Sequence, residues 1–169
     1  MSNQMLLWAM LILPFLTFFF MGKKYIKRYI PAGLFAVLVS TIIGDVGGTF
    51  HFWVRHETAY PLHNLSPWNI SLHMVVTMWV LKFTYRRYWV YLIVNAIFDL
   101  VYAFFFLNTF LPNKGIYNYV AITSFQVWLI NLVTANLIYL FQVWREGGKL
   151  RLAAAKPLPK NQDNGEDKK

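Results

Sequence analysis

The chain of 169 residues contains no cysteine. This absence excludes disulfide frameworks, thiolate nucleophiles and the zinc and iron–sulfur sites that depend on cysteine ligands. The sequence also lacks a Walker loop, a GxSxG motif and the glycine pattern of a Rossmann fold. We therefore expect no cofactor and no enzymatic activity.

Acidic residues are scarce as well. The chain has 7 Asp and Glu against 16 Lys and Arg, which leaves a net charge of +9. Outside the C-terminal segment only Asp45, Glu57 and Asp99 are acidic. A basic chain can bind nucleic acid, but here the Lys and Arg residues form short clusters beside apolar runs. We interpret them as determinants of membrane topology and expect no nucleic-acid partner.

Charged residues make up only 14% of the chain, whereas soluble domains have about 25%. Hydrophobic residues reach 57%, more than a soluble fold of this size can bury. The sequence contains five long apolar runs, and we predict that each is a transmembrane helix. The predicted fold is therefore all-α, a polytopic membrane protein with the lipid bilayer as its main partner. The predicted spans are residues 5–21, 29–50, 68–85, 88–111 and 119–144.

The first run could instead be a signal peptide. No Lys or Arg precedes it, no A-x-A-like cleavage site follows it, and its basic cluster lies on the far side. Pro14 is compatible with a membrane helix, because neighbouring helices satisfy the freed backbone groups. We therefore predict an uncleaved span and a five-span transmembrane domain over residues 1–144.

The distribution of basic residues predicts the orientation. Of the 16 Lys and Arg, only Arg55 and Lys114 fall on one side of the predicted membrane, and the other 14 fall on the opposite side. The positive-inside rule then places the N-terminus outside and the C-terminus inside. Residues 145–169 are polar and predict a disordered basic cytoplasmic tail whose cations lie against anionic lipid.

A polar cluster is predicted deep within the membrane. Asp99 lies near the centre of the run 88–111, where a charged residue costs about 3 kcal/mol. At 1.5 Å per helical residue, Asp99 is level with Asn131 of the fifth span, and Asn95 is level with Asn136. Asn95 and Asp99 are four residues apart and share one face of their helix.

Two interpretations of this cluster stay open. In the first, Asp99 is neutral and forms a hydrogen bond to Asn131 or to a tyrosine hydroxyl, which clamps the fourth span to the fifth. In the second, Asp99 binds a cation or a proton during transport. The substitution Asp99→Asn separates them, since an isosteric amide preserves a clamp but not a transport function.

Small residues recur every four positions in the second span, at Ala36, Ser40, Gly44 and Gly48. This pattern is typical of a seam where membrane helices pack closely. The alternatives are chance and a flexible break at Gly47–Gly48.

A second polar group is predicted near the outer face. Asp45 and His73 fall at the same depth, which favours a structural hydrogen bond between them. Metal binding and solvated interfacial histidines are the alternatives. The sequence His56-Glu57-Thr58-Ala59-Tyr60 has Tyr where the zinc-protease motif has its second His, so we expect no metal. The group consists of Asp45, His51, His56, His63 and His73.

Two apolar stretches are interrupted by short groups of Lys and Arg: LPFLTFFFMGKKYIKRYIPAGLF at 13–35 and WVLKFTYRRYWVYLIVN at 79–95. They resemble segments of uncharacterised small multi-span membrane proteins of spore-forming Gram-positive bacteria. The resemblance implies a bacterial cytoplasmic membrane and no assigned activity.

Two functional classes follow from these features. The first is a non-enzymatic membrane protein that acts by association with other membrane proteins or with itself, through the small-residue face of the second span. The alternative is a small permease or ion-coupled transporter that uses Asp99, Asn95 and Asn131. Because five spans are few for a transporter, the alternative predicts an oligomer. An intramembrane enzyme is a distant third class.

Overall fold

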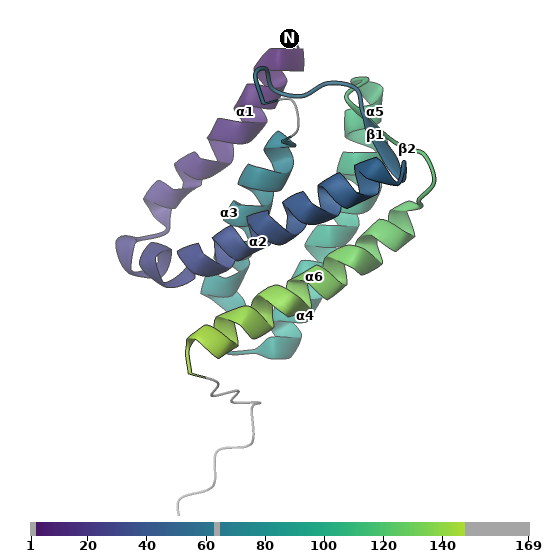
Figure 1. Ribbon diagram of the computed structural model, residues 1–169. Helices are drawn as coiled ribbons and strands as arrows, with labels where there is room; N and C mark the ends of the chain where they lie inside the picture. Colours follow the sequence, from purple (N-terminus) through teal and green to yellow (C-terminus); the bar gives the residue numbers. More distant parts are fainter. Residues whose placement is uncertain (1–2, 63–64, 148–169) are drawn as a thin grey trace, which may run out of the picture.

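The computed structural model describes residues 3–62 and 65–147 (Figure 1). The predicted tail beyond Gly147 and the predicted polar residue His63 lie outside the described residues. The elements in chain order are α1 (Asn3–Leu16), η1 (Thr17–Phe20), α2 (Lys23–Thr49), β1 (Trp53–Arg55), α3 (Pro67–Thr84), α4 (Tyr88–Leu100), η2 (Val101–Phe110), α5 (Leu111–Asn113), β2 (Tyr117–Tyr119) and α6 (Ser124–Arg145).

The described chain forms five consecutive helical stretches, which confirms the predicted all-α class. Four of them are long and apolar enough to cross a membrane. These four stretches are Asn3–Phe20, Lys23–Thr49, Tyr88–Asn113 and Ser124–Arg145. The remaining stretch, α3, is not among the helices that combine sufficient length with sufficient hydropathy, although the sequence predicts a span there.

The position of α3 explains its composition. It packs against α1, α2 and α4, so much of its surface faces protein (Figure 1). Nine of its 18 residues are buried, including Ser71 and Thr77. Polar side chains are tolerated on such a helix because protein groups can satisfy their hydrogen bonds.

Small residues bring α2 into close contact with α3. A side chain at Gly33 would begin 3.0 Å from the side chain of Met78, and one at Gly44 would begin 3.0 Å from Asn69 Nδ2. Two hydrogen bonds cross the contact: Ser40 Oγ donates to the Asn69 carbonyl at 3.3 Å, and Asn69 Nδ2 donates to the Ser40 carbonyl at 3.2 Å. Side chains of α3 therefore pack directly against the glycines of α2.

The structure places Ala36, Ser40 and Gly44 in this seam, whereas Gly48 is only half-buried. Gly47 is buried instead, against the ring of Trp53. The reason is geometric. Each step of four residues along an α-helix turns the side-chain direction by about 40° around the helix axis. A row of residues spaced by four therefore turns away from a straight contact with the neighbouring helix after three steps.

A short ladder joins two distant loops at one end of the bundle. Strands β1 and β2 pair antiparallel, with Trp53 opposite Tyr119. The last helix consequently begins at Ser124, five residues later than predicted. Its start is fixed by a capping box, in which Thr123 and Gln126 exchange side-chain to backbone hydrogen bonds.

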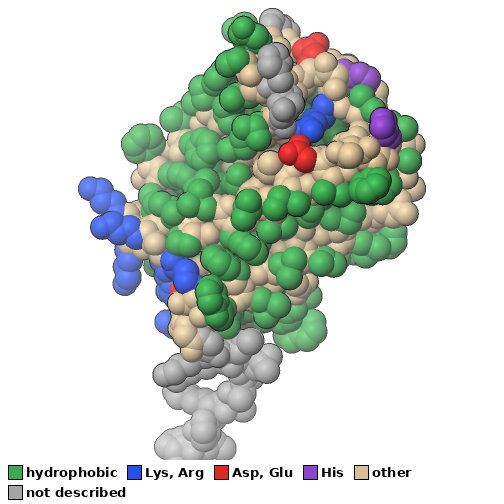
Figure 2. All heavy atoms as spheres, in the orientation of Figure 1, with side chains coloured by type: hydrophobic (Ala, Val, Ile, Leu, Met, Phe, Trp, Pro, Cys, Tyr) green, Lys and Arg blue, Asp and Glu red, His purple; other side chains and the backbone are tan. Residues whose placement is uncertain are grey.

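The opposite end of the bundle carries most of the described Lys and Arg residues. We call it the basic end, and the end with β1 and β2 the strand end. Figure 2 shows Lys and Arg side chains gathered at the basic end, hydrophobic side chains over the middle, and His and acidic side chains near the strand end. The basic end includes the start of α2 with Lys23, Lys24, Lys27 and Arg28.

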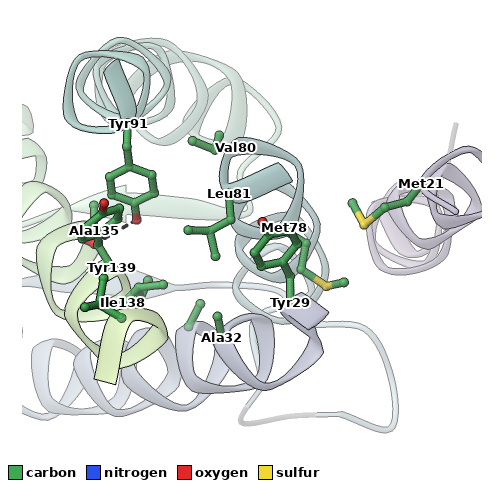
Figure 3. Close-up of a cluster of buried hydrophobic side chains, with 12 residues drawn as sticks. Met21, Tyr29, Ala32, Met78, Val80, Leu81, Tyr91, Ala135, Ile138 and Tyr139 are labelled. Atoms are coloured by element: carbon green, nitrogen blue, oxygen red, sulfur yellow. Dashed lines mark hydrogen bonds between the residues drawn. The ribbon is translucent and has the colours of Figure 1, made fainter. Parts of the chain in front are cut away.

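The half of the core near the basic end is built by four helices. Tyr91 from α4, Leu81 from α3, Ala32 from α2 and Ile138 from α6 come together there (Figure 3). All four side chains are buried. Their contact brings the second, third, fourth and last helical stretches into one apolar cluster.

An ion pair fastens the last helix to α2 at the basic end. Arg28 donates from Nε and Nη2 to the two carboxylate oxygens of Glu146, at 2.6 Å each. Gln142 Nε2 donates to the same carboxylate at 2.6 Å. The Arg28 guanidinium also lies 5.1 Å from the ring centroid of Tyr85. The hydrogen bond from Arg28 holds the pKa of the Glu146 carboxyl below its usual value.

We expect this ion pair to stabilise the fold in a pH-dependent way. Folding lowers the pKa of the Glu146 carboxyl. The stabilisation that the ion pair provides is therefore fully present above the pKa of Glu in the unfolded chain, about 4.3, and is lost as the pH falls through the pKa of Glu146 in the folded chain. The substitution Glu146→Gln should lower stability by at most about 1 kcal/mol at neutral pH, since the pair is partly exposed. Thermal unfolding of both proteins at a series of pH values checks this. An undiminished difference below the folded pKa would contradict it.

The adjacent glycines Gly47 and Gly48 provide a matched pair of substitutions. A Cβ at Gly47 would lie 2.0 Å from Cζ2 of Trp53, whose Nε1 is held by the Gly44 carbonyl at 3.1 Å. We expect Gly47→Ala to destabilise the protein by about 1 to 3 kcal/mol through overpacking. A Cβ at Gly48 would lie at an ordinary 3.6 Å from Arg55 Nη2, so Gly48→Ala should be neutral or stabilising by up to about 1 kcal/mol. Thermal unfolding of the two variants, compared with that of the wild-type chain, tests both expectations.

Candidate functional site

A cavity of about 210 Å³ lies among α3, α4, η2 and α6. It contains the polar residues that the sequence predicts at the centre of the membrane, apart from Asn136. The rest of its wall is mostly apolar and aromatic, with His73, Thr77 and Thr134 as further polar residues. The lining residues are Leu72, His73, Val76, Thr77, Asn95, Phe98, Asp99, Val101, Tyr102, Phe106, Asn131, Thr134, Ala135 and Ile138.

Two polar atoms at this cavity are buried without a partner. Within residues 3–62 and 65–147, neither Oδ2 of Asp99 nor Nδ2 of Asn131 has a hydrogen bond. The two residues lie on the same cavity, as their equal depth predicts, but the predicted clamp between them is not formed. A buried polar group without a partner costs about 1 to 3 kcal/mol. A ligand that donates a hydrogen bond to Oδ2 of Asp99 would recover part of this free energy, and a group that accepts one from Nδ2 of Asn131 would recover the rest.

Other residues hold α4 against α6. The hydroxyl of Tyr88 donates to Oδ1 of Asn136 at 2.6 Å. The hydroxyl of Tyr91 donates to the carbonyl of Ala135 at 2.9 Å (Figure 3). Asn95 donates to the Tyr91 carbonyl of its own helix at 2.8 Å. The helix contact therefore does not depend on Asp99.

A π-helix continues the chain directly after Asp99. The amide of Leu111, at the end of η2, donates to the carbonyl of Phe106 five residues earlier. Tyr102 and Phe106 stack at 5.5 Å, and Phe106 stacks on Phe110 at 5.7 Å. π-Helical segments are frequently found at functional sites. Here the segment supplies an aromatic wall beside the carboxylate.

His73 faces the same cavity as Asp99, which the sequence did not predict. Its ring meets that of Tyr102 edge to face, with 5.2 Å between the centroids. The predicted partner, Asp45, is exposed and forms an ion pair with Nη2 of Arg55 at 3.2 Å. Equal depth did not bring His73 and Asp45 together, because β1 carries Arg55 to the side of α2 that bears Asp45.

The other predicted outer residues remain at the strand end. His51 is exposed and follows α2 with a φ of 57°. Nε2 of His56 lies 3.3 Å from Nδ2 of Asn118. His63 lies outside the described residues. No group of three or more His, Asp or Glu suited to a metal ion exists in the described ranges, so the structure adds no support for a metal site.

The fold and the cavity define a class: a helical protein with four helices long and apolar enough to cross a membrane, and a largely apolar cavity among its helices that contains Asn95, Asp99 and Asn131. Comparisons with protein-family models, with curated proteins and with solved structures give no match. The chemistry of the cavity is therefore the main indication of what the protein does.

Proposed function

We propose that the chain is a five-span membrane protein whose central cavity binds a small organic cation at Asp99, and that it acts as a small permease or ion-coupled transporter. One observation carries this proposal. Within the described residues, Oδ2 of Asp99 and Nδ2 of Asn131 are buried without hydrogen-bond partners, and the two residues line the same cavity. A buried carboxylate requires a positive partner or a proton, and a bound ammonium group supplies both charge and hydrogen-bond donors.

The shape and the walls of the cavity favour a ligand with an apolar part. Its volume of about 210 Å³ exceeds the roughly 150 Å³ that accommodates benzene in an engineered cavity. Phe98, Tyr102 and Phe106 provide aromatic surface beside the carboxylate. Aromatic faces attract cations and bury apolar groups. A small aromatic or aliphatic amine therefore matches the site better than a bare metal ion.

The depth of the site suits transport. Asp99 follows Tyr88 by 11 residues, which places it about 16 Å along the helix and near the middle of a bilayer core of about 30 Å. Transporters bind their substrates near the membrane midplane. Phe98 and Val101, which border the cavity, are 53% and 52% exposed. The cavity thus reaches the side of a single chain, and we propose that a second copy covers it there.

The alternative class, association through the small-residue face of the second span, has less support. Ala36, Ser40 and Gly44 are buried within the single chain, and Ser40 and Gly44 contact Asn69 of α3. A membrane partner would need another surface. The cavity and its unpartnered atoms would also have no role in such a protein.

The orientation forms part of the proposal. Most of the described Lys and Arg residues lie at the basic end and few lie at the strand end. This asymmetry supports a cell-membrane protein with the N-terminus outside and the C-terminus inside. Because the chain has no cysteine, a single introduced cysteine can report on which side of the membrane its position lies. A membrane-impermeant maleimide should label Lys114→Cys in intact cells and Lys24→Cys only after permeabilisation. The reverse labelling pattern would contradict the orientation.

Ligand binding can be tested with benzylamine as the probe and benzyl alcohol as its neutral counterpart. We expect the full chain in lipid nanodiscs to bind benzylamine at least about tenfold more tightly, since one charge-assisted contact contributes about 1.5 to 3 kcal/mol. Asp99→Asn should remove this preference without lowering the unfolding temperature. Isothermal titration, corrected with empty nanodiscs, provides the measurement.

Asp45→Asn is the matched control for this experiment. It changes the same functional group in the exposed ion pair with Arg55, outside the cavity. We expect it to retain the preference for benzylamine. Equal affinity of the wild-type chain for the amine and the alcohol would refute the proposed function.

A further inference from the structure

The residues of α6 that line the Asp99 cavity form one helix face. They are Asn131, Thr134, Ala135 and Ile138, so the last three follow Asn131 by three, four and seven residues. Residues at this spacing lie on the same side of an α-helix. The three residues that follow Asn131 are buried. The side of α6 that faces the cavity therefore includes the side chain of Asn131.

Asp99 lies on a corresponding face across the cavity. The wall residues of α4 and η2 include Asn95, Asp99, Tyr102 and Phe106, which follow one another at steps of four, three and four residues. These steps again place the side chains on one side of the continuous helical stretch. The carboxyl of Asp99 and the amide of Asn131 thus belong to two helix faces that border one space.

Three other hydrogen-bond donors of this wall already have acceptors. Asn95 and Thr134 each donate to the backbone carbonyl four residues earlier in their own helix, at 2.8 and 2.9 Å. The hydroxyl of Tyr102 donates to Oδ1 of Asn69 at 3.3 Å. Nδ2 of Asn131, in contrast, has no acceptor among the described residues. It is a donor that remains for a ligand to use.

The two unpartnered atoms have opposite hydrogen-bonding roles. An ionised carboxylate oxygen such as Oδ2 of Asp99 only accepts, and an amide nitrogen such as Nδ2 of Asn131 only donates. Within the described residues the two atoms are not bonded to each other. A molecule that joins them must present a donor to Asp99 and an acceptor to Asn131. A simple amine such as benzylamine meets only the first requirement.

We propose that the natural ligand of the cavity is an amine that also carries a hydrogen-bond acceptor, such as an amino alcohol, and that Asn131 determines this specificity. The inference rests on the proposed function and narrows its substrate class. The ammonium group of the ligand donates to the carboxylate of Asp99, and the hydroxyl oxygen accepts from Nδ2 of Asn131. The bound ligand then joins α4 to α6 where the sequence predicts a direct contact between these two side chains.

Two amines that differ in one group provide the test. Phenylglycinol and α-ethylbenzylamine are benzylamines that carry a hydroxymethyl and an ethyl group, so the hydroxyl of one takes the place of a methyl group in the other. Both are protonated at neutral pH. A hydroxyl that enters a largely apolar cavity without a partner binds less well than a methyl group. A preference for phenylglycinol therefore requires a hydrogen-bonding partner in the cavity.

Isothermal titration of the full chain in lipid nanodiscs measures this preference. We expect the wild-type chain to bind phenylglycinol about three- to tenfold more tightly than α-ethylbenzylamine, as one neutral hydrogen bond provides. Asn131→Leu removes the donor and keeps a side chain of similar size, so it should reverse the preference. Asn118→Leu is the matched control, the same substitution at an exposed position of β2 outside the cavity, and it should retain the preference.

The outcomes separate this inference from the proposed function. Equal or weaker binding of phenylglycinol, as expected if a water molecule satisfies Asn131, would overturn the inference. The proposed function would stand if benzylamine still binds more tightly than benzyl alcohol, and loss of that charge preference would overturn both. A preference for phenylglycinol that survives in Asn131→Leu would show that another residue recognises the hydroxyl.

A spectroscopic measurement tests the contact itself in the wild-type chain. The chain is prepared with isotope-labelled asparagine, and the side-chain amide signal of Asn131 is identified in NMR spectra by its loss in Asn131→Gln. We expect phenylglycinol to shift this signal several times further than α-ethylbenzylamine does, because only the alcohol accepts a hydrogen bond from Nδ2. Equal shifts with the two amines would refute the contact between the hydroxyl and Asn131.

Discussion

The close contact between α2 and α3 is the constraint on which the rest of the bundle depends. Glycine at positions 33 and 44 removes the side chains that would separate the two helices. The reciprocal hydrogen bonds between Ser40 and Asn69 then hold them in register. With α2 on one side and α1 and α4 against other sides, α3 is sheltered enough to carry His73 and Thr77 toward the cavity.

The structure separates what holds α4 to α6 from what lies in the cavity between them. Tyrosine hydroxyls of α4 donate to Asn136 and to a backbone carbonyl of α6, and the Arg28–Glu146 pair fastens the end of α6. These contacts offset the cost of leaving Asp99 and Asn131 without partners. The unpartnered carboxylate oxygen is the feature on which the proposed ligand site rests.

Much of the architecture could be predicted from the sequence because it depends on one-dimensional properties. The length and hydrophobicity of the runs predicted the helical stretches, and the Lys and Arg clusters predicted which helix ends gather at the basic end. The depth of Asp99 and Asn131 followed from their distance along the chain, and the two residues do border one cavity. The early start predicted for the last helix was wrong, because residues 117–119 form β2 with a strand far away in the chain.

The pairing of polar groups was decided only by the tertiary structure. Hydrogen bonds depend on the rotation of each helix about its axis and on distances of a few tenths of an ångström, neither of which can be read from residue spacing. Asp45 pairs with Arg55 because β1 lies beside α2, and His73 consequently turns to Tyr102 and the Asp99 cavity. Backbone carbonyls such as that of Ala135 act as acceptors without any signal in the side-chain pattern. The sequence by itself determined the helices and the depth of the polar groups, since these depend on composition and length, and the three-dimensional packing determined which of those groups became partners and which stayed free.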